Sequence, residues 1–264
     1  MKKNGIELFG IVAFKDCEAA NIRLYDECKS MNTVMIFAIP YKTDNTPSDT
    51  MNVSEYARVY DYHLYFGNLF TSLIKDLEAE FPSHIFKGFA DHSPINEKKA
   101  AATAGIGVIG KSTLLITEKY GSFVFLGSVI TDLETETEKH EIKSCIDCGR
   151  CIASCPGGAL NKYGFDSEKC ISALTQKKSL TDEDEIKIKA NKAAWGCDVC
   201  QKICPMNENK LTTKIGYFID SYLENVSSET IGNMSNEEFA KYPFSWRKKD
   251  VILRNLTLAE NCGK

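Results

Sequence analysis

The chain contains no long hydrophobic segment. None of its 264 residues lie in an apolar run that approaches ~20 residues, the length needed to cross a membrane. No apolar stretch follows Met1-Lys2-Lys3, where the hydrophobic part of a secretory signal would lie. These absences predict a protein with neither a signal peptide nor a membrane span.

An excess of one charge is also absent. The 32 basic and 36 acidic residues give a formal net charge of −4. No global field therefore favours binding to nucleic acid, although a local basic patch remains possible.

Cysteine, by contrast, is abundant and concentrated. Eight of the eleven cysteines fall between positions 145 and 204. The first run has the spacing C-x2-C-x2-C-x3-C-P and reads Cys145-Ile-Asp-Cys148-Gly-Arg-Cys151-Ile-Ala-Ser-Cys155-Pro156. In bacterial two-cluster ferredoxins the first three cysteines of such a run hold one iron–sulfur cluster and the fourth ligates the other. This run predicts redox chemistry with two [4Fe–4S] clusters.

The second run is one cysteine short of four. It reads Cys197-Asp-Val-Cys200-Gln-Lys-Ile-Cys204-Pro205, and Cys170 lies between the two runs. Cys170 can supply the missing ligand, although an ordinary buried thiol is the alternative. The crossed assignment gives two sets of four, namely Cys145, Cys148, Cys151 and Cys204 on one cluster and Cys155, Cys170, Cys197 and Cys200 on the other.

Zinc or a disulfide framework is the alternative for the whole array. Cluster ligands imply a reducing compartment, so we expect the protein in the cytoplasm. Cys17, Cys28 and Cys262 have no cluster spacing and are interpreted as structural or incidental.

Hydrophobic periodicity predicts mixed helices and strands before the cysteine runs. A charged and flexible connector is expected at 132–143. The other expected elements are a buried strand at 33–40, a long amphipathic helix at 54–81, a strand at 86–90, a helix at 96–104, and a hairpin of 114–117 with 122–131.

Two further motifs are interpreted as decoys. Gly105-Ile-Gly107-Val-Ile-Gly110-Lys111-Ser112 matches the P-loop pattern, but a helical segment precedes it and an apolar, strand-like segment follows it. We therefore expect a glycine turn that allows close backbone approach. Asp61-Tyr62-His63 begins like a cobalt-ligating D-x-H-x-x-G motif, but the glycine comes one residue late. We expect His63 to make a packing or polar contact on a helix face.

Several segments, in order, resemble the epoxyqueuosine reductase family, whose members depend on cobalamin and two [4Fe–4S] clusters. The resemblance spans roughly residues 5–260. The matching segments are Tyr56-Ala-Arg-Val-Tyr-Asp-Tyr-His63, Ala90-Asp-His-Ser-Pro-Ile-Asn-Glu-Lys98, Ala104-Gly-Ile-Gly-Val-Ile-Gly-Lys111, Gly121-Ser-Phe-Val-Phe-Leu-Gly127, Cys170-Ile-Ser-Ala-Leu-Thr175 and Trp195-Gly-Cys-Asp-Val-Cys-Gln201.

The resemblance implies an α+β fold in three parts. These are a cobalamin-binding α/β sandwich-type domain at 1–135, a ferredoxin-like double-cluster domain at 136–210, and a short helical tail at 211–264. By this resemblance cobalamin lies over the sheet of the first domain, and the ferredoxin-like domain lies against one face of the corrin. Electrons would pass through the clusters to cobalt and drive removal of the epoxide oxygen.

The family's proton donor falls on Asp91, which would also contact the cofactor. A carboxyl group in a cofactor pocket can have a raised pKa and stay protonated near neutrality; a turn or cap residue is the alternative. By the same resemblance Leu115, Leu126 and Ser172 line the cobalamin pocket through backbone contacts, with ordinary core positions as their alternative.

The resemblance implies tRNA as substrate and a low-potential electron donor such as ferredoxin or flavodoxin. Family members usually continue into a helical-repeat domain that grips tRNA, whereas this sequence stops at Lys264, so we expect a reduced tRNA surface. The segment 246–249 is interpreted as a remnant contact or a solvated helix face. His92 and Ser93 replace the family's threonine and alanine beside the proposed acid.

Two other functions remain possible at this stage. One is a cobalamin and iron–sulfur reductase of a small molecule, as in the related dehalogenases. The other is a non-enzymatic ferredoxin-type electron carrier, which would leave the first ~130 residues without a purpose, since a bare ferredoxin is about half that length.

Overall fold

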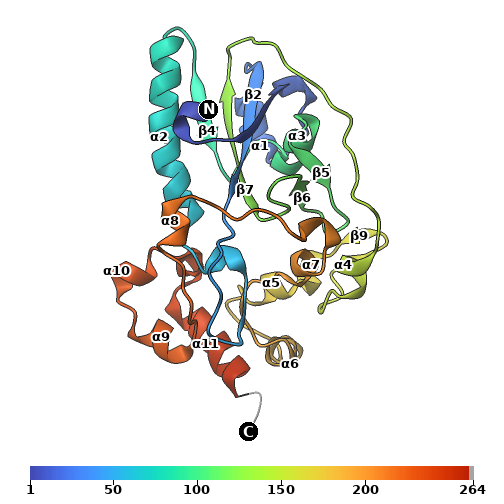
Figure 1. Ribbon diagram of the computed structural model, residues 1–264, viewed down its shortest axis with the longest axis vertical. Helices are drawn as coiled ribbons and strands as arrows, with labels where there is room; N and C mark the ends of the chain where they lie inside the picture. Colours follow the sequence, from blue (N-terminus) through green and yellow to red (C-terminus); the bar gives the residue numbers. More distant parts are fainter. Residues whose placement is uncertain (262–264) are drawn as a thin grey trace. The chain divides into compact units, whose positions relative to one another are not determined.

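The computed structural model describes residues 1–261, and these form two compact units (Figure 1). The first unit contains Met1–Pro40, Tyr62–Gly110 and Leu114–Asp147. The second contains Tyr41–Asp61, Lys111–Thr113 and the chain from Cys148 onward. The units are thus discontinuous in sequence, whereas the ranges expected from the sequence were continuous.

The first unit is built on an antiparallel sheet. In the described residues its strand order is β1 (Leu8–Ala13), β2 (Thr33–Pro40), β7 (Val124–Thr131) and β4 (Phe86–Phe89). The predicted strand at 33–40 is confirmed, and every residue of it except Pro40 is buried. Its continuous apolar run is explained by its place between β1 and β7, with both faces covered.

Helices cover the two faces of this sheet (Figure 1). Phe66 of α2 (Tyr62–Glu80) stacks on Phe37 of β2, with ring centroids 6.0 Å apart. The neighbouring Ile36 points to the opposite face, where it joins the core formed with α3 (Glu97–Thr103). A short helix, α1 (Ile22–Glu27), precedes β2. The mixed helix-and-sheet fold expected from the sequence is confirmed.

Two predicted elements differ from the structure. The long helix begins only at Tyr62, because 52–53 form strand β3 and 55–57 a 3-10 turn. The predicted hairpin of 114–117 with 122–131 is wrong: β6 (Leu115–Thr117) pairs with β5 (Gly107–Ile109), while β7 pairs with β2 and β4. The glycine segment therefore contains a strand.

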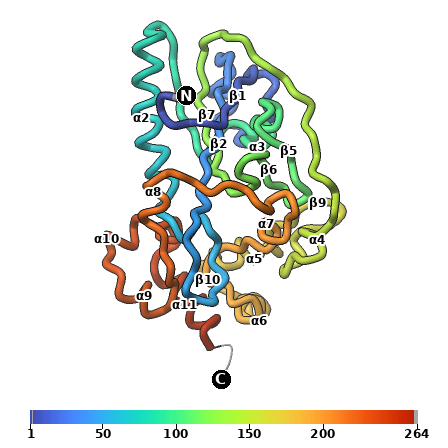
Figure 2. Tube along the Cα trace, in the orientation of Figure 1, coloured from blue at the N-terminus to red at the C-terminus, as the bar shows by residue number. Residues whose placement is uncertain are grey.

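The connector at 132–143 lies along the first unit, and Figure 2 shows it passing outside β5. The main-chain N–H of Glu138 donates to the Ile11 carbonyl over 3.2 Å, and that of His140 donates to the Thr103 carbonyl over 2.9 Å. The sequence predicts a flexible connector here, but its backbone is hydrogen-bonded to β1 and to the end of α3.

The second unit contains short strands and many short helices. Its core surrounds Trp195, which is fully buried, and parallel pairing of β3 (Asn52–Val53) with β10 (Ala193–Trp195) joins segments far apart in sequence. The remaining elements are β8 (Leu160–Asn161), β9 (Gly164–Phe165), α4 (Arg150–Ala153), α5 (Ile171–Leu174), α6 (Asp182–Ala190), α7 (Val199–Lys202), α8 (Gly216–Ile219), α9 (Ser228–Asn233), α10 (Asn236–Phe239) and α11 (Lys249–Glu260).

Other sequence predictions can be placed on this fold. Cys17 and Cys28 are buried in the first unit, as expected for structural thiols, whereas Cys262 lies outside the described residues. Trp246 is 58% exposed, which fits a solvated surface. Over residues 1–261 no helix combines the length and apolar composition that crossing a bilayer requires.

Candidate functional site

Asp91 lies on an exposed turn directly after β4. Its φ of 63° is in the left-handed region, which a non-glycine residue adopts uncommonly. The turn is closed by the N–H of His92, which donates to the Ala90 carbonyl over 2.8 Å, and by that of Ser93, which donates to the Asp91 carbonyl over 2.9 Å. The side chain of Asp91 is 69% exposed. This backbone presents the carboxyl group outward, where a ligand can reach it.

The first turn of α2 supplies the partners of Asp91. His63 Nε2 lies 3.8 Å from Asp91 Oδ2, so the predicted polar contact of His63 is confirmed. The His63 ring stacks on Tyr62 at 4.1 Å between centroids, and Tyr62 stacks in turn on Phe125 of β7 at 4.3 Å. An aromatic surface thus supports an acid–base pair.

The pKa of Asp91 is lowered, contrary to the expectation from the sequence. Hydrogen bonding from His63 is the main cause, and it outweighs the opposing effect of partial burial. Charges on His63 and His92 and a hydrogen bond from Tyr62 act in the same direction. Desolvation alone would raise this pKa, but the contact with His63, which the sequence does not reveal, reverses the direction. At neutral pH Asp91 is therefore ionised beside a histidine.

A second carboxyl group, which the sequence did not single out, lies next to Asp91. Burial raises the pKa of Glu97 to about 8, and the Asp91 charge adds to this effect. Glu97 Oε1 is buried and has no hydrogen-bond partner within residues 1–261. Glu97 belongs to the same family-like segment as Asp91, and that shared segment was the only available signal in the sequence.

The other residues expected at the cofactor occupy varied positions. Leu115 is buried in the core, and Leu126 is partly buried against the same core. Ser172 lies in α5 of the second unit. Its carbonyl accepts hydrogen bonds from Thr175 Oγ1 over 2.8 Å and from Gln176 Nε2 over 3.1 Å.

The glycine segment makes the close approach predicted for it. A Cβ on Gly107 would lie 2.5 Å from the Ile116 carbonyl oxygen, so β5 and β6 can pack as they do only with glycine there. Gly105 has a φ of 77° and precedes this strand. A P-loop needs a strand before its glycines and a helix after them. Here α3 precedes and the β5–β6 hairpin follows, which agrees with the decoy interpretation.

Four of the predicted ligand thiols lie near one another in the second unit. Burial raises the pKa of Cys200 to about 12, and charges on Cys197, Cys170 and Cys155 raise it further, together with that of Asp198. Such mutual effects require the thiols to be close. Bound iron would instead lower the pKa of these thiols, because it stabilises thiolates. These four are the members of one predicted set, so the residues present fit a cluster.

A glycine brings two of these cysteines together. A Cβ on Gly157 would lie only 1.9 Å from the Lys169 carbonyl oxygen. The turn that carries Cys155 therefore packs directly against the backbone that precedes Cys170. Cys170 is the N-cap of α5, and its carbonyl accepts the N–H of Leu174 over 2.9 Å.

Buried polar groups hold the second cysteine run. Asp198 accepts hydrogen bonds from Ser54 Oγ, from the Glu55 N–H over 2.7 Å and from Gln201 Nε2 over 3.0 Å. Asn52 Nδ2 lies 4.0 Å from the Cys197 sulfur. The segment at 52–55 thus positions the loop between Cys197 and Cys200, which explains why this segment does not continue the helix.

The other predicted set is spread over both units. Cys145 belongs to the first unit, where its N–H donates to the Ile109 carbonyl over 3.2 Å. Cys148 precedes α4, Cys151 lies in it, and Cys204 follows α7; α4 and α7 pack against each other. In the described part of the chain, none of the ten cysteines between positions 17 and 204 forms a disulfide bond. Within residues 1–261, no three Cys, His, Asp or Glu side chains are arranged to hold a single metal ion.

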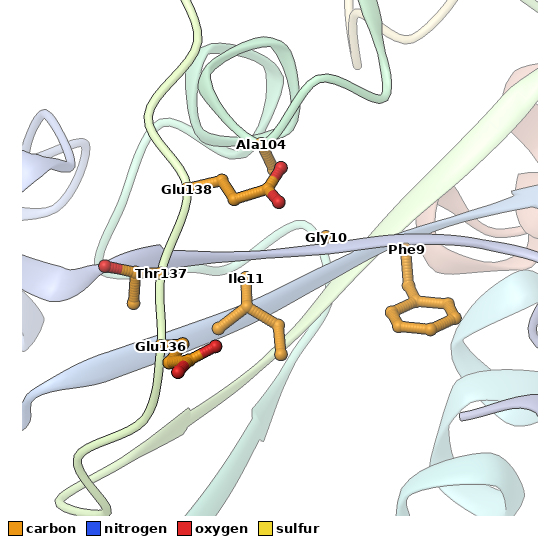
Figure 3. Close-up of a pocket in the computed structure, with 7 residues that line it drawn as sticks. All are labelled: Phe9, Gly10, Ile11, Ala104, Glu136, Thr137 and Glu138. Carbon is orange, nitrogen blue, oxygen red and sulfur yellow. The ribbon is translucent and has the colours of Figure 1, made fainter.

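A separate cavity of about 610 Å³ lies under the connector in the first unit (Figure 3). The connector contributes Glu136, Thr137 and Glu138, while β1 contributes Phe9 and Ile11. Figure 3 shows the Glu138 carboxylate extending toward Ala104. None of the predicted site residues lines this cavity.

Comparisons with known proteins agree with this geometry. Residues 144–207 match the family described as "4Fe-4S double cluster binding domain", which assigns two clusters to the cysteine region. Residues 23–92 match the family described as "Epoxyqueuosine reductase QueG, DUF1730".

Curated relatives carry the same name. The epoxyqueuosine reductase of Lactococcus garvieae is 30% identical over 249 residues, which cover 89% of this chain and 69% of the relative. That of Staphylococcus aureus is 30% identical over 204 residues, or 75% of this chain, but the match spans only about half of that relative (53%).

Solved structures are similar over almost the whole chain. The epoxyqueuosine reductase of Streptococcus thermophilus superposes with a TM-score of 0.82 at 27% identity, and the match covers 98% of this chain and 78% of that one. A crystal structure of epoxyqueuosine reductase with an epoxyqueuosine-modified tRNA-Tyr stem loop has the same TM-score and the same coverage at 24% identity, which indicates a shared fold.

Proposed function

This chain belongs to the epoxyqueuosine reductase family, and we propose that it reduces epoxyqueuosine to queuosine in tRNA. The reaction consumes two electrons and two protons, and the epoxide oxygen leaves as water. The observation that carries the proposal is the turn at Asp91, where an outward-facing carboxylate lies 3.8 Å from His63. An acid–base pair of this kind can deliver a proton to a departing oxygen.

The cysteine region supplies the electrons in this proposal. Cys155, Cys170, Cys197 and Cys200 would ligate one cluster, and Cys145, Cys148, Cys151 and Cys204 the other. A low-potential donor such as ferredoxin or flavodoxin would reduce them, in a reducing cytoplasm where thiolate ligands persist.

Cobalamin is proposed as the cofactor that, when bound, supplies the two electrons that break the carbon–oxygen bonds. The first unit offers groups that suit a large planar ligand: the exposed Asp91 turn, the adjacent aromatic surface of Tyr62 and Phe125, and the backbones of Leu115 and Leu126. In the second unit Ser172 is proposed as a further backbone contact.

Asp91 must carry a proton when the oxygen leaves, although its pKa is lowered in this structure. We propose that His63 supplies that proton through the contact described above. As negative charge develops on the epoxide oxygen, transfer of the proton from Asp91 to that oxygen becomes favourable. A proton from His63 then replaces the one that Asp91 has lost. A carboxyl group backed by a histidine can thus act as an acid despite its low resting pKa.

The test is an anaerobic assay of the reconstituted full chain. Protein loaded with iron, sulfide and cobalamin would be incubated with tRNA that bears epoxyqueuosine and a low-potential reductant. Mass spectrometry of the digested tRNA would measure queuosine. We expect queuosine in the complete mixture and none without reductant. Absence of queuosine at every salt concentration, in protein with full cluster and corrinoid spectra, would overturn the proposal and favour a small-molecule substrate.

A further inference from the structure

The last described helix of the chain reaches the cysteine region through Asn255. This residue lies in α11 and is fully buried. Its side-chain nitrogen donates two hydrogen bonds, to the Thr175 carbonyl over 2.7 Å and to the Ala194 carbonyl over 3.0 Å. A primary amide carries two N–H groups, so one asparagine can join two backbone segments at once. Asn255 thereby links the end of α5 to β10.

The two linked segments lead to three of the four cysteines proposed for one cluster. Cys170 directly precedes α5, and Thr175 is the C-cap of that helix. β10 ends at Trp195, and Cys197 and Cys200 follow it in the chain. Movement of α5 relative to β10 would therefore change the distance between Cys170 and the other two thiols.

A further hydrogen bond joins the same segments beside the cysteines. The N–H of Gly196 donates to Thr175 Oγ1 over 3.0 Å, and this hydroxyl donates to the Ser172 carbonyl over 2.8 Å. Thr175 thus binds the residue before Cys197 through its side chain and Asn255 through its backbone. Both Thr175 and Asn255 are fully buried, so loss of either bond would leave a buried polar group without its partner.

The orientation of the Asn255 amide is fixed from within α11. Arg254 Nη2 donates to Asn255 Oδ1 over 2.9 Å, so the oxygen is occupied and the nitrogen is directed to the two carbonyls. Arg254 also donates to the carbonyls of Lys177 and Lys178, over 2.9 Å each, and so holds the chain that follows α5.

We propose that Asn255 is a positioning residue for the cluster. It holds the segments that carry Cys170, Cys197 and Cys200 at the separation that one [4Fe–4S] cluster requires. The helical tail at 211–264 is thereby part of the cluster-binding structure. The inference rests on the ligand set given under the proposed function.

The direct test is release of iron from the reconstituted full chain to a chelator. In Asn255→Ala about four of about eight iron atoms should be released at least about tenfold faster, since loss of an outer partner of a metal ligand typically costs about 10- to 100-fold in affinity. The other half should keep its wild-type rate. In a Cys170→Ala background, Asn255→Ala should leave release of the remaining iron unchanged. Unchanged release in the single variant, or faster release in that background, would overturn the proposal.

Leu256 is the matched control. It is the next residue of α11, is equally buried, and packs in the core around Trp195. Leu256→Ala should lower the urea midpoint of unfolding at least as much as Asn255→Ala, because it leaves a cavity, but it should not change the rate of iron release. Equal acceleration in the two variants would mean that Asn255 acts only through the stability of α11, which contradicts the proposal.

Two substitutions at Thr175 keep the proposal testable if Asn255→Ala fails to fold. Thr175→Val removes the hydroxyl that accepts the Gly196 N–H, whereas Thr175→Ser keeps it. Hydrogen exchange at the Gly196 amide in the full chain should be about tenfold faster in Thr175→Val and near the wild-type rate in Thr175→Ser. Iron release should follow the same order. Wild-type iron release in Thr175→Val would show that alignment of α5 with β10 does not control the cluster.

Failure of the proposed function can be told apart from failure of this inference. A wild type that forms no queuosine but releases its iron as described would refute the function alone. Retention of about eight iron atoms in Cys170→Ala would refute the ligand set on which the inference rests. Gly196 exchange in Asn255→Ala, expected to be about tenfold faster than in the wild type, decides independently of iron whether Asn255 holds the two segments together.

Discussion

The cysteine region and the Asp91 turn are held in place in different ways. The loop around Cys200 is fixed by the buried Asp198, which accepts three hydrogen bonds, and Gly157 packs against backbone beside Cys170. The Asp91 turn is exposed, and the hydrogen bonds donated by His92 and Ser93 lie within the turn itself. The difference indicates that the cysteine region is built for fixed geometry, as cluster ligands require, whereas Asp91, the proposed acid, is open to solvent.

The largest effect is expected from loss of a cluster ligand. Cys170→Ala should lower the iron content from about eight to about four per chain, because one complete set of four thiolates is broken. Queuosine formation should be lost with it. Cys28→Ala is the control: this thiol is buried in the first unit and should leave iron unchanged. Full iron content in Cys170→Ala would exclude Cys170 as a ligand.

A slightly smaller effect is expected from Gly157→Ala. The new Cβ would lie 1.9 Å from the Lys169 carbonyl oxygen, so the backbone between Cys155 and Cys170 must move. We expect a loss of about 2–4 kcal/mol in the free energy of unfolding, measured with urea, together with lower iron content.

Gly232→Ala provides the comparison for that variant. Gly232 lies in α9, and its Cβ would meet open space. This substitution should be neutral or stabilise the protein by up to about 1 kcal/mol. Equal stability of the two variants would show that the turn beside Cys155 is more adaptable than its packing indicates.

A subtler effect is expected at Asn52. Its side-chain N–H lies 4.0 Å from the Cys197 sulfur, and hydrogen bonds to sulfur raise cluster potentials. Loss of about 1 kcal/mol of such stabilisation in Asn52→Ala would make the potential about 40 mV more negative. Redox titration followed by electron paramagnetic resonance would measure this, with the exposed Asn225→Ala as control. An unchanged potential would remove Asn52 from the tuning of the cluster.

The cysteine region and the Asp91 turn also differ in how well the sequence predicts them. The double-cluster region could be predicted because the spacing of its cysteines is local, and Cys170 was proposed as a ligand by counting. The continuous apolar run at 33–40 likewise predicted a buried strand correctly. These features depend on residues near one another in the chain.

Features that depend on distant residues were predicted poorly. Residues 54–57 have a helical pattern, but Ser54 and Glu55 instead bind Asp198, and the helix begins only at Tyr62. The hairpin prediction failed because Gly107 allows β6 to pair with β5. The pKa of Asp91 depends on His63, which belongs to another element.

The most direct test of the account is Asp91→Asn, studied for cluster content and turnover in one preparation. Because Asp91 and the cysteine region are held separately, we predict full iron content and unchanged cluster spectra. Queuosine formation should fall at least about a hundredfold, the usual contribution of a general acid. Turnover within a few-fold of the wild type, with both clusters intact, would contradict the claim that Asp91 delivers the proton.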